Sequence, residues 1–430
     1  MTGSRIELQN VRIEYKAGLE IPKLAHVRQT FPVDPEIDAA AAAVRETGRI
    51  LSGKNLEGKQ IAVAVGSRGI PGLDQIVTAV VAALRDAGAA PFIIPAMGSH
   101  GGATVEGQLK VLAAYGITVD KAGAPIRSSL EAVNYGDLDG IPLYCDANAW
   151  NADGVFLINK IKPHTDFHGE IESGLVKMGI IGLGKHAGAA AFHSRGFAGF
   201  SRRLQGAFPV FLRHVKLLGG LAVIQNAYDK LSLIEGIPAE NLPAREMELL
   251  PLARDRMPSV PAAKADLLIL DEIGKNISGS GFDPNVFAWE GDPESAAGAK
   301  TLYDRLYIKS LTPESEGHGT GAYFSDILSL QTVNSIDWGK TWTNCMTLNL
   351  TKSHGIPIFL KNDLEAIRTL VNCFRQDQWP GLRVLRVKNT LEMETFAVSE
   401  PLWNEIRNLP GVEILTDFTP LRFDEEGRLI

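Results

Sequence analysis

The feature that most constrains the fold of this sequence is a strand–helix–strand pattern near its beginning. Gln60–Val65 (QIAVAV) is typical of a buried strand, and Leu73–Gly88 (LDQIVTAVVAALRDAG) has the apolar spacing of a helix that ends at a glycine. Pro91–Met97 (PFIIPAM) is a second strand-like run. Because the connections are short, the pattern predicts parallel strands joined by a crossover helix. A helix over Thr104–Tyr115 and a strand over Gly154–Ile161 are predicted to continue it.

The alternation resumes after a proline-rich break at Ile237–Pro261. Lys264–Asp271 (KADLLILD) predicts a new strand, and the loop EIGKNISGSGFDPN follows it. We therefore expect an α/β protein made of two α/β lobes with mostly parallel sheets and a cleft between them. The expected N-terminal lobe is 1–236 and carries the catalytic and cofactor loops. The expected C-terminal lobe is 262–430 and completes the cleft.

The composition excludes several classes of partner. The 430 residues carry a net charge of -7, and Lys and Arg never occur more than two in a row, which argues against nucleic acid or an anionic membrane as a partner. The three cysteines are far apart, which argues against an iron–sulfur cluster, a zinc ribbon or a disulfide scaffold. The N-terminus has no apolar signal segment, and the longest apolar run, IVTAVVAAL, is too short to span a bilayer. We expect a cytoplasmic protein that acts on a small molecule, and the sequence does not indicate its oligomeric state.

Three loops follow the carboxyl ends of predicted strands, where open α/β sheets bind their ligands. They contain Gly66–Gly69 (GSRG), Gly98–Gly102 (GSHGG) and Lys160–His164 (KIKPH). Each loop places an ionisable side chain beside glycine or proline. Any one of them is also explained as an ordinary turn. Three such loops in succession favour a shared site.

Two histidines in these loops suit proton transfer. His100 and His164 follow different strands, so they can face one pocket from two sides. Such a pair fits a reaction that removes a proton on one face of a substrate and returns it on the other. The guanidinium of Arg68 nearby would bind a carboxylate through two parallel hydrogen bonds.

Histidine spacing also raises the question of a metal. His164 and His168 are four residues apart, as in a helical zinc pair, but Pro163 and Gly169 flank them and no Glu follows His164 as in HExxH. The local sequence therefore argues against a helical zinc pair.

His186 and His193 are seven apart and would share one face of a helix about 10 Å apart along its axis. This segment can therefore supply at most one ligand to a given ion, and a cofactor can supply the others.

Together these motifs resemble the nickel-dependent lactate racemase family, the LarA-like 2-hydroxyacid racemases and epimerases. The matching segments are VGSRGIP, GSHGGATVEGQ, IKPHTDFHGEIESGLVK and AAFHSRG. The later GKNISGSGFDPN resembles a branch of the family whose GSHGGAT loop differs from that of the founding lactate racemases. The resemblance extends from about residue 60 to 290.

The resemblance implies an isomerase that racemises or epimerises a 2-hydroxy acid by reversible hydride transfer. It implies a nickel pincer nucleotide as cofactor, that is, nickel with pyridinium-3,5-bisthiocarboxylic acid mononucleotide. By position in the motifs, it implies His193 as the protein ligand to nickel and His100 and His164 as opposed acid/base groups. Arg68 matches the arginine that binds the substrate carboxylate.

The resemblance also implies contacts to the cofactor and the substrate. Lys177 matches the lysine that tethers the cofactor covalently, and Lys185 or a cofactor without a tether is the alternative. Further expected contacts are Ser67, Gly98 and Gly102 to the cofactor, and Lys275 to the substrate.

Other functions stay open from the residues alone. One is a zinc-dependent hydrolase or lyase that uses His164, His168 and a carboxylate such as Asp166 or Glu170. Another is a non-catalytic protein that binds a hydroxy acid in the same cleft. Within the racemase interpretation, Gly101–Gly102 leaves more room than the Arg-Pro of lactate racemases, which favours a substrate larger than lactate, such as a sugar acid.

Overall fold

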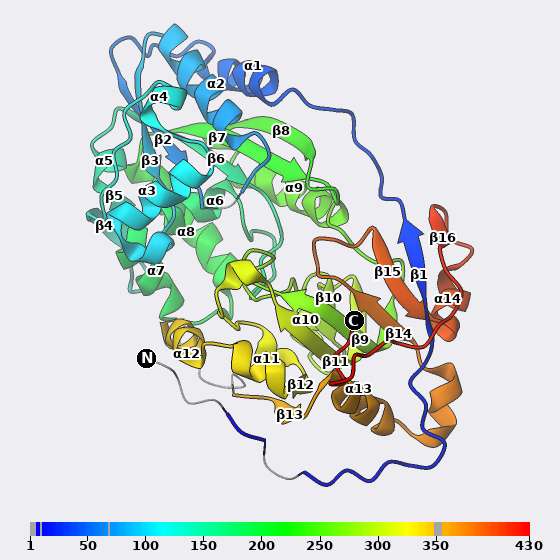
Figure 1. Cartoon of the computed structure of the whole chain (residues 1–430). Coiled ribbons are helices and arrows are strands. Elements are labelled where there is room, and N and C mark those ends of the chain that lie inside the picture. Colours follow the sequence, from blue (N-terminus) through cyan, green and yellow to red (C-terminus); the bar gives the residue numbers. More distant parts are fainter. Residues whose placement is uncertain (1–5, 9–10, 68, 348–354) are drawn as a thin grey trace. The chain divides into compact units, whose positions relative to one another are not determined.

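The computed structural model describes residues 6–8, 11–67, 69–347 and 355–430, and in it the chain forms two compact units (Figure 1). The inserted unit is Val33–Met257, and the split unit combines Met1–Pro32 with Pro258–Ile430. This division differs from the expected lobes, since the first 32 residues belong with the C-terminal half. The reason is that β1 (Leu24–Gln29) pairs antiparallel with β15 (Thr395–Ser399) and β16 (Val412–Ile414).

The inserted unit contains a sheet with the strand order β3-β2-β6-β7-β8. Its strands are β2 (Gln60–Val65), β3 (Ala90–Pro95), β6 (Gly154–Lys160), β7 (Leu217–Gln225) and β8 (Leu231–Pro238). The first four in the order run parallel, and only β8 is antiparallel to its neighbour. The strands predicted at 60–65, 91–97 and 154–161 are therefore confirmed, with ends shifted by one or two residues.

Helices cover both faces of this sheet. The principal helices are α1 (Ala39–Leu51), α2 (Leu73–Asp86), α3 (Val105–Ala114), α8 (Phe200–His214) and α9 (Ala244–Asp255). Alternate residues of β2 point to opposite faces: Ile61 and Val63 pack in the core with α1 and α2, whereas Ala62 and Ala64 pack in the core with α8. Helix α8 ends at His214, and the apolar run from Leu217 joins the sheet as β7. The predicted break at Ile237–Pro261 contains helix α9, which belongs to the inserted unit.

Shorter elements complete the inserted unit. They are η1 (Gly101–Ala103), α4 (Val119–Ala122), the hairpin β4 (Ala132–Leu138) and β5 (Ile141–Asp146), α5 (Ala147–Trp150), α6 (Leu175–Lys177), the π-helical turn η2 (Met178–Gly182), α7 (Lys185–His193) and η3 (Ala239–Asn241). Of these, α6, η2 and α7 follow closely on one another from Leu175 to His193, and the stretch carries four of the residues singled out in the sequence: Lys177, Lys185, His186 and His193.

The split unit is built on a second sheet with the order β13-β12-β11-β9-β14-β15-β1-β16, to which β10 adds beside β11. Its remaining strands are β9 (Lys264–Ile273), β10 (Phe287–Trp289), β11 (Thr301–Leu311), β12 (Ile327–Ser329), β13 (Ile358–Leu360) and β14 (Val384–Val387), which pair in parallel. Its helical elements are α10 (Pro293–Ala296), η4 (Pro313–Ser315), η5 (Ala322–Phe324), α11 (Leu330–Ser335), α12 (Trp338–Thr347), α13 (Asp363–Asn372), η6 (Gln376–Gly381) and α14 (Glu400–Ile406).

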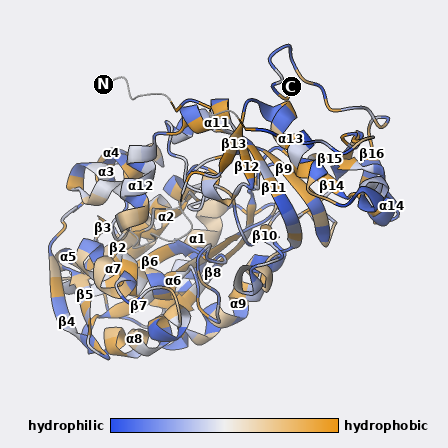
Figure 2. Cartoon of the chain, turned by 90° about the horizontal axis from the view of Figure 1, so that it is seen from below, coloured by the Kyte–Doolittle hydropathy of each residue, from blue (hydrophilic) through white to orange (hydrophobic). Residues whose placement is uncertain are grey.

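The predicted fold class, α/β with mostly parallel sheets, is thus confirmed. Figure 2 shows apolar residues along the interior strands and polar residues on outer helices such as α9 and α14. None of the described helices combines the length and the apolar composition that crossing a bilayer would require.

Candidate functional site

The sheet of the inserted unit brings the three predicted loops to one edge. Strands β3, β2 and β6 are adjacent and parallel, so their carboxyl ends meet at the same side. Ser67 follows β2, His100 follows β3 and His164 follows β6. The loop of Ser67 therefore lies between the loops of the two histidines. Arg68, the predicted carboxylate-binding residue, falls outside the described residues.

The His100 loop is a tight glycine turn. Nδ1 of His100 lies 2.9 Å from the carbonyl oxygen of Met97, which can only accept, so Nδ1 carries the proton of the neutral ring and Nε2 its lone pair. Gly101 has φ 68, and a Cβ there would come within 2.7 Å of the backbone nitrogen of Gln108. Only glycine fits this approach, which holds the turn against α3.

The side chain of Gln108 stabilises this turn through hydrogen bonds to its backbone. Its side chain is fully buried, and its Nε2 donates to the carbonyl oxygens of Gly98 (3.1 Å) and His100 (3.4 Å). Its Oε1 accepts a hydrogen bond from Nζ of Lys185, 3.0 Å away. The first residue of α7 is therefore connected through one side chain to the backbone of His100.

Lys185 occupies an interior position. Its Nζ also donates to the carbonyl oxygen of Pro95 at 3.0 Å and lies 3.2 Å from Oδ2 of Asp146. Burial lowers the pKa of Lys185, while the neighbouring Asp146 carboxylate opposes that shift. An ammonium held in this way is poorly placed to form a covalent bond with a ligand. Which lysine carries a tether, if either does, stays a prediction.

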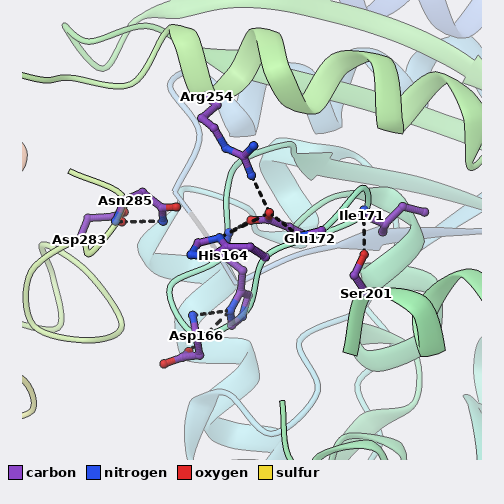
Figure 3. A network of polar contacts seen from close by, with 10 residues as sticks. His164, Asp166, Ile171, Glu172, Ser201, Arg254, Asp283 and Asn285 are labelled. Carbon is purple, nitrogen blue, oxygen red and sulfur yellow. Dashed lines mark hydrogen bonds and ion pairs between the residues drawn. The ribbon is translucent and has the colours of Figure 1, made fainter. Parts of the chain in front are cut away.

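The His164 loop is shaped by a buried carboxylate. Glu172 has a side chain that is 0% exposed, and its Oε2 accepts from the backbone N–H of His164 at 2.6 Å. Its Oε1 accepts from the N–H of Gly169 at 3.0 Å. The same oxygen accepts from Nη2 of Arg254 on α9 at 2.6 Å, as Figure 3 shows. A buried carboxylate needs such partners. Glu172 therefore fixes the path of the backbone that carries His164.

The His164 side chain is 13% exposed and stacks on the ring of Phe167, with centroids 4.3 Å apart. Its Nδ1 accepts a hydrogen bond from the backbone N–H of Asp166 at 3.1 Å. The same Nδ1 lies 3.6 Å from Oδ2 of the Asp166 carboxylate. Asp166 thus places both a hydrogen-bond donor, its backbone N–H, and an acceptor, its carboxylate, near Nδ1 of His164.

His193 ends α7 close to the same aromatic side chains. Its Nδ1 lies 2.6 Å from the carbonyl oxygen of Ala189, so Nε2 holds the lone pair of the neutral ring. Its ring centroid is 5.7 Å from that of Phe197 and 5.4 Å from that of Phe200. The ring of Phe197 is also 6.2 Å from that of His164. Two predicted site residues therefore contact one phenyl ring.

Lys177 belongs to the same group. Its Nζ lies 5.5 Å from the centre of the Phe167 ring, on which His164 stacks. Burial lowers the pKa of His193, and the positive charge of Lys177 lowers it further. The hydrogen bond to the Ala189 carbonyl acts in the opposite direction but is a smaller effect than burial. His193 is therefore favoured in the neutral form that binds metals.

The other predicted contacts differ in character. The backbone N–H of Gly98 donates to the carbonyl oxygen of Gly182 at 3.1 Å, so this N–H is already used in a hydrogen bond within the protein. A Cβ on Gly102 would have no heavy atom within 4 Å, so Gly102 borders open space. Lys275 follows β9 in the split unit, where its Nζ donates to Oδ1 of Asn344 at 2.7 Å. Contacts of Ser67, Gly98 and Gly102 to a cofactor and of Lys275 to a substrate stay predictions.

The geometry gives no support to the zinc interpretation. Across the described ranges, no three His, Cys, Asp or Glu side chains are grouped so as to hold a metal ion. Nδ1 of His168 lies 3.6 Å from Oε1 of Glu172, an oxygen that already accepts two hydrogen bonds. Glu170 is exposed and accepts from Gln205 at 3.2 Å.

Several residues of the site could not be singled out in the sequence. Glu172 lies inside the motif segment HGEIES, which marks it as a candidate site residue. Its partner Arg254 is 82 residues away, so their ion pair could not be predicted. Phe197 follows His193 in AFHSRGF, where an aromatic residue is equally typical of a core. Gln108 ends the segment GSHGGATVEGQ, but nothing there marks it as a buried support of the turn, and Asp146 stands in a segment without any chemical motif.

No model of a known protein family matches this sequence, and no curated protein matches it. Among solved structures, the chain is similar to the lactate racemase apoprotein from Thermoanaerobacterium thermosaccharolyticum, with 11% sequence identity and a TM-score of 0.43. The similarity covers 77% of this chain and 93% of that chain. A likeness of this degree supports no statement about activity.

Proposed function

We propose that this protein is an isomerase that racemises or epimerises a 2-hydroxy acid with the help of a nickel pincer nucleotide. One observation carries the proposal: His164 and His193 contact the same Phe197 ring, and Lys177 lies over the adjoining Phe167. The motif resemblance assigns these three residues to proton transfer, nickel binding and cofactor attachment. The common sheet edge adds the loop of His100.

The residues present fit such a cofactor. The Nδ1–H of His193 is directed at a backbone carbonyl, which leaves Nε2 to bind a metal. The amine of Lys177 lies in the same aromatic surroundings and would form the attachment.

In this proposal the protein positions the substrate and moves protons at its hydroxyl oxygen. Arg68 binds the carboxylate through its guanidinium. When bound, the cofactor supplies a hydride acceptor for the alpha carbon. His100 takes the hydroxyl proton of one enantiomer, and His164 gives a proton to the oxygen of the 2-oxo acid on the opposite face; the roles reverse for the other enantiomer. Phe167 and Phe197 provide an apolar wall beside His164.

The open space at Gly102 supports a substrate larger than lactate, such as a sugar acid. The cysteines of this chain are free, which supports a cytoplasmic location.

Isotope labelling tests the reaction. The protein, purified from its own host with its nickel content measured, is incubated with alpha-deuterated lactate and with alpha-deuterated aldonic acids. We expect the inverted product to keep its deuterium, because the hydride returns to the same molecule. Loss of deuterium to solvent, or no turnover by protein with one nickel per chain, would contradict the proposal.

Variants assign the roles. Replacing His100 or His164 by Ala is expected to lower turnover at least 1,000-fold, within the range of an essential acid or base. His186→Ala is the matched control, because His186 is exposed on the same helix as His193.

A further inference from the structure

The backbone fixes the ring protons of the site histidines in two different ways. Nδ1 of His100 and Nδ1 of His193 each face a carbonyl oxygen, at 2.9 Å and 2.6 Å, so in both neutral rings the proton is on Nδ1. Nδ1 of His164 instead faces the N–H of Asp166 at 3.1 Å. An amide N–H can only donate, so in the neutral ring of His164 the proton is on Nε2.

We infer that Asp166 is a positioning residue for His164, and that it makes His100 and His164 present opposite Nε2 atoms, a lone pair on His100 and an N–H on His164. Before substrate arrives the neutral pair thus presents one acceptor and one donor, and His164 becomes the acid once its ring takes up a second proton from solvent. This consequence for catalysis rests on the proposed function, whereas the ring tautomers do not.

The carboxylate of Asp166 also faces the proton that Nδ1 carries when the ring of His164 is doubly protonated. Its Oδ2 lies 3.6 Å from the same Nδ1 and accepts a hydrogen bond from Oγ1 of Thr165 at 2.9 Å, which holds it in place. When the ring of His164 carries two protons, the second is on Nδ1 and faces this carboxylate. Delivery of the Nε2 proton to the substrate oxygen then leaves a neutral ring with its proton on Nδ1 and a lone pair on Nε2. His164 is in that state a base for the reverse reaction.

The surroundings of the ring are consistent with this role. Among the described residues, the charged groups near the His164 ring include Asp166, the carboxylate of Glu172, which binds the His164 backbone, and the ammonium of Lys177, which lies 5.5 Å from the centre of the Phe167 ring. Glu172 is engaged by hydrogen bonds to two backbone N–H groups and to Arg254. Asp166 is therefore the carboxylate placed to respond to a proton on Nδ1.

Nitrogen NMR tests the inference on the protein without nickel or substrate. Long-range proton–nitrogen spectra of 15N-histidine-labelled protein separate the two neutral tautomers, and the variants H100N, H164N and H193N assign the signals. At a pH at which the rings are neutral, we expect the proton on Nδ1 of His100 and His193 and on Nε2 of His164. A His164 with its proton on Nδ1 would overturn the inference.

The variant Asp166→Asn separates the two parts of the residue, because it keeps the backbone N–H and removes the carboxylate. We expect the neutral tautomer of His164 to stay unchanged, and the ratio of doubly protonated to neutral His164 at a given pH to fall about sevenfold, as for a unit charge lost at 3.6 Å in water. Asp139→Asn is the control, since Asp139 is exposed in a turn of the same unit with φ 51, which asparagine also adopts. An unchanged protonated fraction in Asp166→Asn would overturn the role of the carboxylate.

The same measurements separate this inference from the proposed function. Tautomers as expected in a protein that turns over no hydroxy acid would leave the inference in place and remove the proposed function. An active protein in which His100 and His164 have the same tautomer would do the opposite.

Discussion

Lys185 and Asp146 form an ion pair, with 3.2 Å between Nζ and Oδ2, in which both side chains are 0% exposed. The backbone of Lys185 has φ 56, a conformation that residues other than glycine rarely adopt. Its ammonium connects the start of α7 with the end of β3 through the carbonyl oxygen of Pro95. Through this hydrogen bond, the helix that ends in His193 is attached to the end of β3, where the His100 loop begins.

Replacing this lysine should strongly destabilise the inserted unit. Lys185→Met leaves the carboxylate of Asp146 buried without its counter-charge, so we expect the free energy of unfolding to fall by about 3–5 kcal/mol. Urea unfolding measures the change. Lys110→Met, at an exposed position of α3, should change it by less than about 0.5 kcal/mol. The double variant with Asp146→Asn should recover part of the loss, and a loss below about 1 kcal/mol in Lys185→Met would show that the pair is dispensable.

The mass of the purified protein decides between tether and non-covalent binding. In the proposed function the cofactor is attached through Lys177, so Lys177→Arg should lack the additional mass that the wild-type chain carries. Lys162→Arg, a half-buried lysine in the His164 loop, should keep it. Intact-mass spectrometry of protein from the native host reads both. An adduct that persists in Lys177→Arg would exclude this residue as the tether.

Weakening the carboxylate that shapes the His164 loop should affect stability and the histidine together. Glu172→Gln keeps the size of the side chain but loses charge-assisted hydrogen bonds to two N–H groups and to Arg254, so we expect a loss of about 1.5–3 kcal/mol. Glu170→Gln is the matched control, because Glu170 is exposed two residues away. Urea unfolding gives the stability, and the ring signal of His164 should shift only in the first variant. Equal effects in both variants would refute the special role of Glu172.

Glu246 should make stability depend on pH near neutrality. Its side chain is buried, and although it accepts a hydrogen bond from Val176 N–H at 3.0 Å, burial raises the pKa of Glu246 to about 7. Between the ordinary value of 4.5 and about 7, the folded protein binds this proton and the unfolded chain does not. The free energy of unfolding therefore falls as pH rises through this window, by up to about 3 kcal/mol, and levels off above it.

The variant Glu246→Gln should remove this contribution. Its free energy of unfolding, relative to wild type, should increase between pH 5 and pH 8 by the same amount. Glu240→Gln, at an exposed position of η3, should follow the wild type. Parallel pH profiles for Glu246→Gln and wild type would show that Glu246 is not the titrating group.

The sequence predicted what local patterns decide. The apolar run of β2, the periodic spacing of α2 and the glycine after it are local signals, and all three elements form as predicted, with Gly88 at φ 83 after the helix. The common edge of the loops with His100 and His164 follows from the parallel order of their strands. These conclusions required no knowledge of distant contacts.

Contacts between distant positions were beyond the reach of the sequence. The pairing of β1 with β15 joins residues that are far apart in the chain, and nothing in either strand specifies the other. The burial of Lys185 contradicts the usual preference of lysine for the surface and depends on Asp146, at the end of the β4–β5 hairpin. The approach of Phe197 to both histidines depends on how α7 and the His164 loop pack together, which no local motif records.

The late partners of β1 have a consequence for how the protein is made. A ribosome delivers Leu24–Gln29 early, yet the strands that complete its ladder, Thr395–Ser399 and Val412–Ile414, emerge only near the end of translation. All five strands of the inserted unit's sheet are synthesised within residues 60–238, so that unit can fold while the rest of the chain is still being elongated. The N-terminal segment must meanwhile stay accessible, and a nascent chain arrested before residue 395 should contain a folded inserted unit and an unprotected β1.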